Sequence, residues 1–250
     1  MYADRDRYVA DPQFIPVPVE RLLDPTYLAE RARLIGDRFG PPPQAGQLAM
    51  RGKDATREAQ GTSHLVVMDA AGNVVSMTTT VESVFGSGRT VGGFVLNNQL
   101  TDFSYRPTDE HGPVANAVQG GKRPRSSMAP IIVVDHDGRF VAAFGSPGGS
   151  AILDYNTKTA VGLLAWNLSM QAAIELPNLI ARGADVGGEV DRFSPQVVSG
   201  LRAKGIDLGP GRSEISGLHG LMRKPDGTLE GGADSRREGI VRMLPPPAAH

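Results

Sequence analysis

The sequence predicts a layered α+β fold, because runs of apolar, β-branched residues alternate with segments of helical periodicity. Two of these runs, at residues 64–68 and 131–135, each lead into a turn sequence and a second strand-like run. Residues 151–167 form the longest helical pattern and directly follow a Gly-Gly-Ser sequence. Buried strands with helices outside them pack in layers, so we expect sheets covered by helices.

Composition and charge exclude several classes of protein. The 250 residues suffice for one large domain or two small ones. The chain has 26 basic and 27 acidic side chains and no long basic run. Its charge therefore does not predict binding to nucleic acid or to an anionic membrane. The absence of cysteine excludes a thiol nucleophile, disulfides and thiolate metal ligands. No apolar stretch is long enough to span a membrane, and the first residues lack a signal-peptide core.

The beginning of the chain predicts one helix and an exposed connector. Asp24 before Pro25 is typical of a helix start, and apolar residues then recur at helical spacing as far as Gly36. Residues 39–61 contain three consecutive prolines, several glycines and many charges, without apolar periodicity. We therefore expect an amphipathic helix followed by an exposed connection.

Shorter signals predict the remaining elements. Further strand-like runs lie at residues 74–81, 93–96, 140–144, 215–222 and 239–244. Two serines are expected to cap helices that end near Pro177 and Lys204, namely Ser169 and Ser194. His64 alternates with apolar neighbours and is expected to be a packed core residue. The histidines show no metal-ligand spacing, so no metal site is expected.

Four motifs follow one another in the middle of the chain. They are Gly-Thr-Ser-His-Leu-Val-Val-Met-Asp at 61–69, Asn-Asn-Gln-Leu-Thr-Asp-Phe-Ser at 97–104, Lys-Arg-Pro-Arg-Ser-Ser-Met-Ala-Pro at 122–130 and Gly-Ser-Pro-Gly-Gly-Ser at 145–150. Their order and spacing resemble the small-subunit region of γ-glutamyltransferases, and the likeness extends over essentially the whole chain. The resemblance implies an N-terminal-nucleophile hydrolase, in which two subunits cut from one precursor build a four-layer αββα sandwich.

The resemblance also implies how the chain is divided. Residues 1–61 correspond to the end of the large subunit and a connector, and residues 62–250 to the small, nucleophile-bearing subunit. No residue here matches the arginine with which the family's large subunit binds the substrate α-carboxylate. We therefore expect a C-terminal fragment with an incomplete sandwich, whose partner is the missing large-subunit portion.

Thr62 is the nucleophile that the resemblance implies, with the precursor cut between Gly61 and Thr62. An internal threonine hydroxyl is a weak nucleophile, whereas the cut frees an α-amino group that can take the proton from the same residue's hydroxyl. An α-amino group ordinarily has a pKa of about 7.7–8.0, so part of it is neutral near pH 7. Without the motifs, Thr62 is more simply interpreted as a residue ahead of a strand.

Three further catalytic positions follow from the resemblance. Thr80 matches a threonine that hydrogen-bonds the nucleophile, although the residues by themselves allow an ordinary strand threonine. Gly148 and Gly149 match the pair whose backbone N–H groups form the oxyanion hole. Two glycines ahead of a helix expose N–H donors at its positive end, which favours this role; an ordinary tight turn or a phosphate loop stays open.

Four positions match residues that hold the γ-glutamyl group. Asp102 is expected to accept hydrogen bonds from the substrate α-ammonium. The hydroxyls of Ser126 and Ser127 are expected to donate to the substrate α-carboxylate. Gln99 occupies a position at which relatives carry Gln or Glu. By pattern alone, Asp102 can also be a cap or turn residue, and the serines a polar loop. Glu82 stands where characterised transferases carry an asparagine, and an acceptor-only anion there leaves the substrate preference open.

Together these assignments predict acyl transfer without a cofactor. Thr62 attacks the γ-amide of glutathione or a related γ-glutamyl compound, and water or an amine acceptor then takes the glutamyl group. One alternative is a glutaryl- or cephalosporin-type acylase, favoured by Glu82 and by a covering loop shorter than in many relatives. Another is a catalytically inert fragment. Relatives are often periplasmic or extracellular, and the sequence itself leaves the compartment open.

Overall fold

The computed structural model describes residues 1–49, 51–56, 61–210 and 215–244. The chain divides into two compact units, which consist of residues 1–58, 98–126 and 181–211 (unit 1) and residues 59–97, 127–180 and 212–250 (unit 2). Each unit is therefore assembled from three separate stretches of chain. None of the described helices is long and apolar enough to cross a membrane. The sequence-based division at residue 61 concerns chain cleavage and stays a prediction.

Unit 2 opens with a β-hairpin that carries the expected nucleophile at its first position. Strand β1 (Thr62–Met68) pairs antiparallel with β2 (Val74–Thr80), so that Thr62 lies opposite Thr80. The strand expected at the start of this unit is confirmed. Only one of its faces is buried, however, because its outer face exposes Leu65 and Val67.

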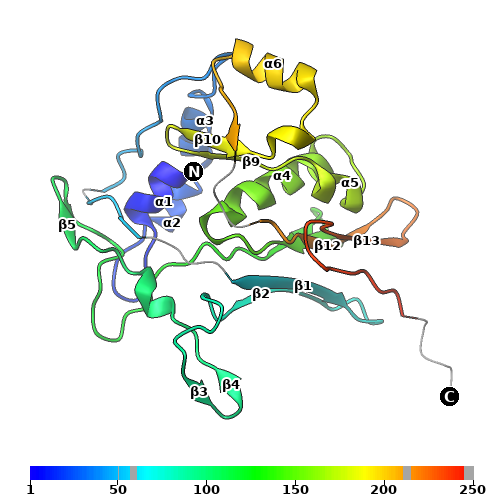
Figure 1. The fold of residues 1–250 in the computed structure, drawn as a ribbon, viewed down its shortest axis with the longest axis horizontal. Coiled ribbons are helices and arrows are strands. Elements are labelled where there is room, and N and C mark those ends of the chain that lie inside the picture. The colour runs from blue at the N-terminus through cyan, green and yellow to red at the C-terminus, as the bar shows by residue number, and fades with distance from the viewer. Residues whose placement is uncertain (50, 57–60, 211–214, 245–250) are drawn as a thin grey trace. The chain divides into compact units, whose positions relative to one another are not determined.

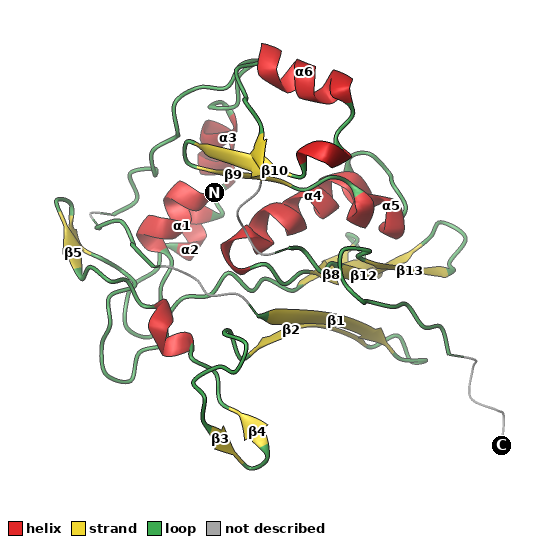
Figure 2. Cartoon of the chain, in the orientation of Figure 1, coloured by secondary structure: helices red, strands yellow, loops and turns green. Residues whose placement is uncertain are grey.

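A four-stranded antiparallel sheet packs against this hairpin, in the order β13-β12-β8-β7. Its strands are β7 (Ile131–Val134), β8 (Phe140–Gly145), β12 (His219–Arg223) and β13 (Leu229–Ala233). The other face of the sheet is covered by α4 (Ile152–Leu164) and α5 (Met170–Glu175), as Figures 1 and 2 show. A separate small hairpin is formed by β3 (Thr90–Val91) and β4 (Phe94–Val95). Unit 2 thus has the layer order hairpin, sheet, helices.

The apolar core of unit 2 lies between the sheet and its two helices. Ala142 and Phe144 on β8 belong to one buried cluster with Tyr155 on α4 and with Met170 and Ile174 on α5. Burial of these large side chains removes apolar surface from water and holds the helical layer on the sheet. The core therefore fixes the junction between β8 and α4, where the expected oxyanion glycines lie.

Unit 1 consists of short helices and small sheets. Its α-helices are α1 (Tyr2–Tyr8), α2 (Val19–Leu22), α3 (Pro25–Ala32) and α6 (Pro195–Ala203), and its 3-10 helices are Gln99–Asp102 and Val190–Arg192. A two-stranded ribbon is formed by β5 (Thr108–Asp109) and β6 (Gly112–Pro113). A three-stranded sheet has the order β11-β10-β9, with the strands β9 (Leu179–Arg182), β10 (Asp185–Gly188) and β11 (Gly209–Pro210). The chain passes from unit 2 into unit 1 within β9.

Several sequence-based expectations about the elements are wrong. The helix that Asp24 caps ends at Ala32, short of Gly36, and it buries no apolar face in the described chain. The connector is not exposed throughout, because Asp54 is buried. The strand expected at residues 239–244 is absent, whereas β13 was not expected at all.

His64 on β1 is a buried core residue, as the sequence predicts. Its Nδ1 lies 2.9 Å from Thr78 Oγ1, and its ring lies so close to Gly145 that a Cβ there would come within 2.4 Å. Burial, with a smaller contribution from the neighbouring His219, lowers the pKa of His64 to about 4. The imidazole is therefore neutral in the folded chain near pH 7.

This lowered pKa makes folding sensitive to acid. Between pH 6.5 and about 4 the unfolded histidine binds a proton that the folded one excludes, so stability is lost as the pH falls through this window. We expect the free energy of unfolding to drop by about 2 kcal/mol between pH 7 and pH 5. Urea titrations at the two pH values measure the drop. The drop in the free energy of unfolding should be much smaller in His64→Gln. It should be the same as in the wild type in the matched control His136→Gln, because the His136 side chain is exposed. A full-sized drop in His64→Gln would contradict the assignment of this pH dependence to His64.

Candidate active site

The two ends of the β1–β2 hairpin bring two threonine hydroxyls together in unit 2. Thr62 Oγ1 lies 3.1 Å from Thr80 Oγ1, which lies 3.0 Å from the carbonyl oxygen of Gly61. The Thr62 hydroxyl can donate to Thr80, while the Thr80 hydroxyl donates to the Gly61 carbonyl. Thr62 is only 8% exposed. The hydrogen bond expected between the two threonines is thus present, and it extends to the peptide bond at which the cut is expected.

Gly61 is required by the backbone at this point. Its φ of +140° is one that only glycine adopts readily, and a Cβ would lie 2.1 Å from the carbonyl oxygen of Glu82. A larger residue would therefore have to displace the backbone. The glycine allows the carbonyl ahead of Thr62 to approach the Thr80 hydroxyl.

Glu82 lies directly beside the threonine pair. Its backbone N–H donates to Thr80 Oγ1 at 2.7 Å, and its φ of +72° is rare for a residue with a side chain. The side chain is buried, and its Oε2 has no hydrogen-bond partner among the described residues. Strained backbone and a buried carboxylate both occur preferentially at functional sites. The position at which this sequence departs from the characterised transferases is therefore next to the expected nucleophile.

Gly148 and Gly149 lie at the junction between β8 and α4. Their φ values are +140° and +53°, and a Cβ on Gly148 would come within 2.5 Å of the Tyr155 ring. Gly149 begins a 3-10 turn that leads directly into α4. The first N–H groups of a helix have no acceptor within the helix, so this junction presents donors suited to a developing oxyanion.

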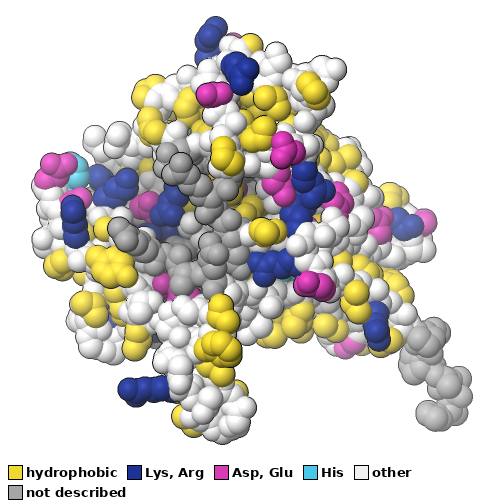
Figure 3. All heavy atoms as spheres, in the orientation of Figure 1, with side chains coloured by type: hydrophobic (Ala, Val, Ile, Leu, Met, Phe, Trp, Pro, Cys, Tyr) yellow, Lys and Arg dark blue, Asp and Glu magenta, His cyan; other side chains and the backbone are white. Residues whose placement is uncertain are grey.

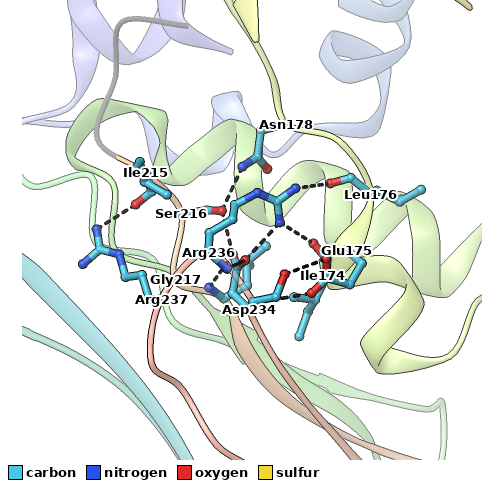
Figure 4. Close-up of polar contacts among 12 residues, drawn as sticks. Ile174, Glu175, Leu176, Asn178, Ile215, Ser216, Gly217, Asp234, Arg236 and Arg237 are labelled. Carbon is cyan, nitrogen blue, oxygen red and sulfur yellow. Dashed lines mark hydrogen bonds and ion pairs between the residues drawn. The ribbon is translucent and has the colours of Figure 1, made fainter. Parts of the chain in front are cut away.

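A polar network surrounds the buried carboxylate of Asp234 (Figure 4), and through Gly217 it reaches the chain just ahead of the glycine pair. Asp234 Oδ2 accepts from Ser216 Oγ at 2.6 Å, and Asp234 Oδ1 pairs with Arg236 at 3.0 Å. The N–H of Gly217 then donates to Ser146 Oγ. Burial by itself would raise the pKa of Asp234, but hydrogen bonds from Ser216 and Arg236 outweigh it and hold the pKa below its usual value. An ionised carboxylate therefore anchors this loop.

Arg237 contacts the backbone of the expected nucleophile. Its Nη1 donates to the carbonyl oxygen of Thr62 at 3.4 Å, and its Nη2 donates to the carbonyl oxygen of Ile215 at 2.7 Å. The guanidinium thus links β1 to the loop that precedes β12. Sequence reasoning missed Arg237 and Asp234, because neither lies in a local pattern that indicates such a role.

The residues expected to bind the γ-glutamyl group are divided between the two units. Gln99 and Asp102 are the first and last residues of a 3-10 helix in unit 1, where Ser126 is also found. Ser127 belongs to unit 2. Asp102 and Ser127 are buried, Gln99 is half-buried and Ser126 is exposed. Their roles in binding stay predictions.

Asp135, His136 and Asp137 bring three potential metal ligands together in the turn between β7 and β8. The two aspartates are already used in the turn: Asp135 accepts from the N–H of Arg139, and Asp137 pairs with the Arg139 guanidinium. Carboxylates of exposed turns commonly make such contacts without a metal. The expectation of no metal site stays a prediction.

The hairpin, sheet and helix layers of unit 2, with a threonine opening the first strand, define an N-terminal-nucleophile hydrolase fold. Comparison with known proteins identifies the family. The family model for gamma-glutamyltranspeptidase matches residues 1–244, so the chain belongs to the γ-glutamyltranspeptidase family. The resemblance derived from the four sequence motifs is confirmed.

Relatives and solved structures agree with this assignment. The chain is 36% identical over 256 residues to the glutathione hydrolase proenzyme of Bacillus subtilis, covering 96% of this chain and 42% of that protein. A γ-glutamyltranspeptidase structure from Helicobacter pylori matches with a TM-score of 0.61 and 28% identity, covering 70% of this chain and 99% of that one. A cephalosporin acylase from Bacillus halodurans matches with a TM-score of 0.81 and 25% identity, covering 98% and 43%. The chain thus spans less than half the length of its curated bacterial relatives.

Proposed function

We propose that this chain carries the nucleophile for γ-glutamyl transfer or hydrolysis, with glutathione and related γ-glutamyl compounds as donors. The observation that carries the proposal is the hydrogen-bond chain from Thr62 through Thr80 to the Gly61 carbonyl. It joins the expected nucleophile to the peptide bond whose cleavage would free its amine. The similarity to a glutathione hydrolase proenzyme supports the same activity.

Self-cleavage follows from this arrangement. Thr62 Oγ1 attacks the carbonyl carbon of Gly61, and the Thr80 hydroxyl stabilises the negative charge that develops on the carbonyl oxygen. Collapse breaks the C–N bond, moves the acyl group onto Oγ1 as an ester and leaves the proton on the nitrogen. Water then hydrolyses the ester, which yields a carboxylate at Gly61 and a free α-amine on Thr62.

Turnover uses the freed amine as the base. It takes the proton of the Thr62 hydroxyl while Oγ1 attacks the γ-carbonyl carbon of the donor. The N–H groups of Gly148 and Gly149 stabilise the oxyanion, and the amine portion of the donor leaves with the proton. Water or an amine acceptor then releases the glutamyl group from Thr62. Asp102 is proposed to bind the donor α-ammonium, and Ser126 and Ser127 its α-carboxylate.

A second candidate function is acylase activity on glutaryl-type chains. Glu82 favours it, since a buried acidic side chain beside the nucleophile replaces the asparagine of characterised transferases. The likeness to a cephalosporin acylase structure supports it as well. Asp102 argues against it, because a glutaryl donor has no α-ammonium for that carboxylate to bind.

A donor comparison decides between these functions. We expect the full-length protein to hydrolyse γ-glutamyl p-nitroanilide with a kcat/KM about tenfold or more above that for glutaryl p-nitroanilide, because one charge-assisted contact is worth roughly that factor. The two donors differ only in the α-amino group. A preference for the glutaryl donor would establish the acylase instead. For the 250-residue chain expressed alone, an intact mass without cleavage at Gly61–Thr62, together with no turnover of either donor, would indicate an inert fragment.

The outer face of the β1–β2 hairpin is the surface that we propose for the missing large-subunit portion. Leu65 lies opposite Met77 and Val67 opposite Val75, and these four side chains are 38–55% exposed. Figure 3 shows hydrophobic side chains along the edge where these strands lie. A contiguous apolar face on a hairpin is typical of an interaction surface. Covering it would add an outer layer to the hairpin, sheet and helix layers of unit 2.

A further inference from the structure

Asn116 lies at the centre of a buried hydrogen-bond network within unit 1 that the proposed mechanism does not use. The residue is 1% exposed. Its Nδ2 donates to the carbonyl oxygen of Asp102 at 2.8 Å, and its Oδ1 accepts from the N–H of Arg125 at 3.0 Å. One amide group therefore joins the end of the 3-10 helix that carries Asp102 to the residue directly ahead of Ser126.

The same amide reaches the chain upstream of the expected cut. Asn116 Nδ2 lies 3.1 Å from Asp54 Oδ2 and 3.0 Å from Thr56 Oγ1. Thr56 Oγ1 lies in turn 2.6 Å from Asp54 Oδ1 and 3.2 Å from the carbonyl oxygen of Asp102. Thr56 and Asn116, which are far apart in the sequence, thus both contact the carbonyl oxygen of Asp102. Asp54 and Thr56 of the connector act here as a fixed support for the segment expected to bind the donor.

Charge pairing makes this network costly to rearrange. The Arg125 side chain is 1% exposed, and its guanidinium pairs with Asp54 at 2.9 Å and with Asp6 at 3.0 Å. Separating a buried guanidinium from its carboxylates leaves an uncompensated charge, which is strongly unfavourable. A network with few alternative arrangements is suited to holding neighbouring groups at a fixed separation.

We propose that Asn116 is a positioning residue for donor recognition. Its two hydrogen bonds keep the distance between the Asp102 backbone and the residue before Ser126 constant. This constant distance determines how closely the Asp102 carboxylate approaches the α-ammonium of a donor. The inference rests on the proposed function, in which Asp102 binds that ammonium. Asn116 acts through Asp102, and not on the reacting atoms.

The test measures two donors that differ only in the α-amino group. In the full-length protein, Asn116→Ala is expected to lower kcat/KM for γ-glutamyl p-nitroanilide about tenfold, mainly through KM, because it weakens a charge-assisted contact to the donor. The value for glutaryl p-nitroanilide should change less than about twofold, since this donor has no ammonium for Asp102 to bind. Intact mass and thermal unfolding report on cleavage and folding of each variant.

A second variant covers the case in which Asn116→Ala does not fold. Thr56→Val removes the hydroxyl contacts to Asp54 and Asp102 with little change of volume, and should reduce donor selectivity in the same direction by a smaller factor. Asn178→Ala is the matched control: this buried asparagine donates to Ser216 in unit 2, and its loss should affect both donors equally. In an Asp102→Asn background, Asn116→Ala should cause no further loss of selectivity.

The outcomes separate the inference from the function on which it rests. Equal losses for both donors in Asn116→Ala and Thr56→Val would overturn the positioning role and leave Asn116 a structural residue. Further loss of selectivity in the Asp102→Asn background would overturn it as well. A wild-type protein without preference for the γ-glutamyl donor would overturn the proposed function, and the positioning role with it.

Discussion

Thr62→Ala in the full-length protein is expected to abolish both self-cleavage at Gly61–Thr62 and turnover of a γ-glutamyl anilide. The change removes the oxygen that lies 3.1 Å from Thr80 Oγ1, and it leaves the backbone pairing of β1 with β2 intact. Without that oxygen no ester forms, so the precursor bond stays closed and no α-amine is freed. Loss of a covalent nucleophile lowers kcat by roughly 10⁴-fold or more, so turnover should fall below detection.

Two measurements check this result separately. Electrophoresis and intact mass follow the cut, and release of p-nitroaniline follows turnover. Thr62→Ser is the matched control, because serine keeps the hydroxyl and the future α-amine and lacks only the methyl group. It should still be cut, more slowly. A Thr62→Ala protein that is cut at this bond and still hydrolyses the donor would disprove the assignment of the nucleophile.

Asp234→Ala is expected to lower the free energy of unfolding by about 3–5 kcal/mol. The Asp234 side chain is fully buried, and its removal takes away the carboxylate that lies 3.0 Å from the guanidinium of Arg236, which is itself 5% exposed. The hydroxyl of Ser216 loses its acceptor as well. Because the loop that contains Ser216 also holds Ser146 through the N–H of Gly217, we expect slower self-cleavage in addition to lower stability.

Thermal and urea unfolding measure this loss, and an exposed aspartate provides the control. Asp226 accepts hydrogen bonds from the N–H and the hydroxyl of Thr228 in the turn between β12 and β13, in a position open to water. Asp226→Ala should therefore change the unfolding midpoint little. If Asp234→Ala and Asp226→Ala unfold at the same midpoint, the network around Asp234 does not stabilise the fold.

The local pattern of the sequence by itself determined the hairpins, the helix starts and the family. β1, β2, β7 and β8 lie within a residue or two of the runs that predict them, because β-branched residues and turn sequences act over a few positions. The caps at Asp24, Ser169 and Ser194 are likewise present, since each side chain accepts from N–H groups two or three residues ahead. The family follows from the order of the four motifs, which consist of residues adjacent in the chain.

Tertiary structure alone decided the boundaries of the last strands and the exposure of the first helices. β13 has the sequence Leu-Glu-Gly-Gly-Ala, which shows no strand pattern, and it forms because β12 offers an edge with which it can pair. Residues 239–244 carry a better strand pattern and form no strand. Leu28 and Ile35 have helical spacing, yet both are exposed in the described chain. Apolar spacing shows which face could be buried, and contacts determine whether it is.

The supporting residues of the site also depend on folding. Asn116 stands between two alanines, and its partners at positions 54, 56, 102 and 125 meet only in the folded unit. Asp234 and Arg237 likewise find their partners far away in the sequence. A buried polar group must be satisfied by whichever donors and acceptors the fold brings to it. The expected nucleophile and the glycine before it are adjacent in the sequence, so a local motif identifies them. The residues that support the site come together only in the folded chain, so no local motif could identify them.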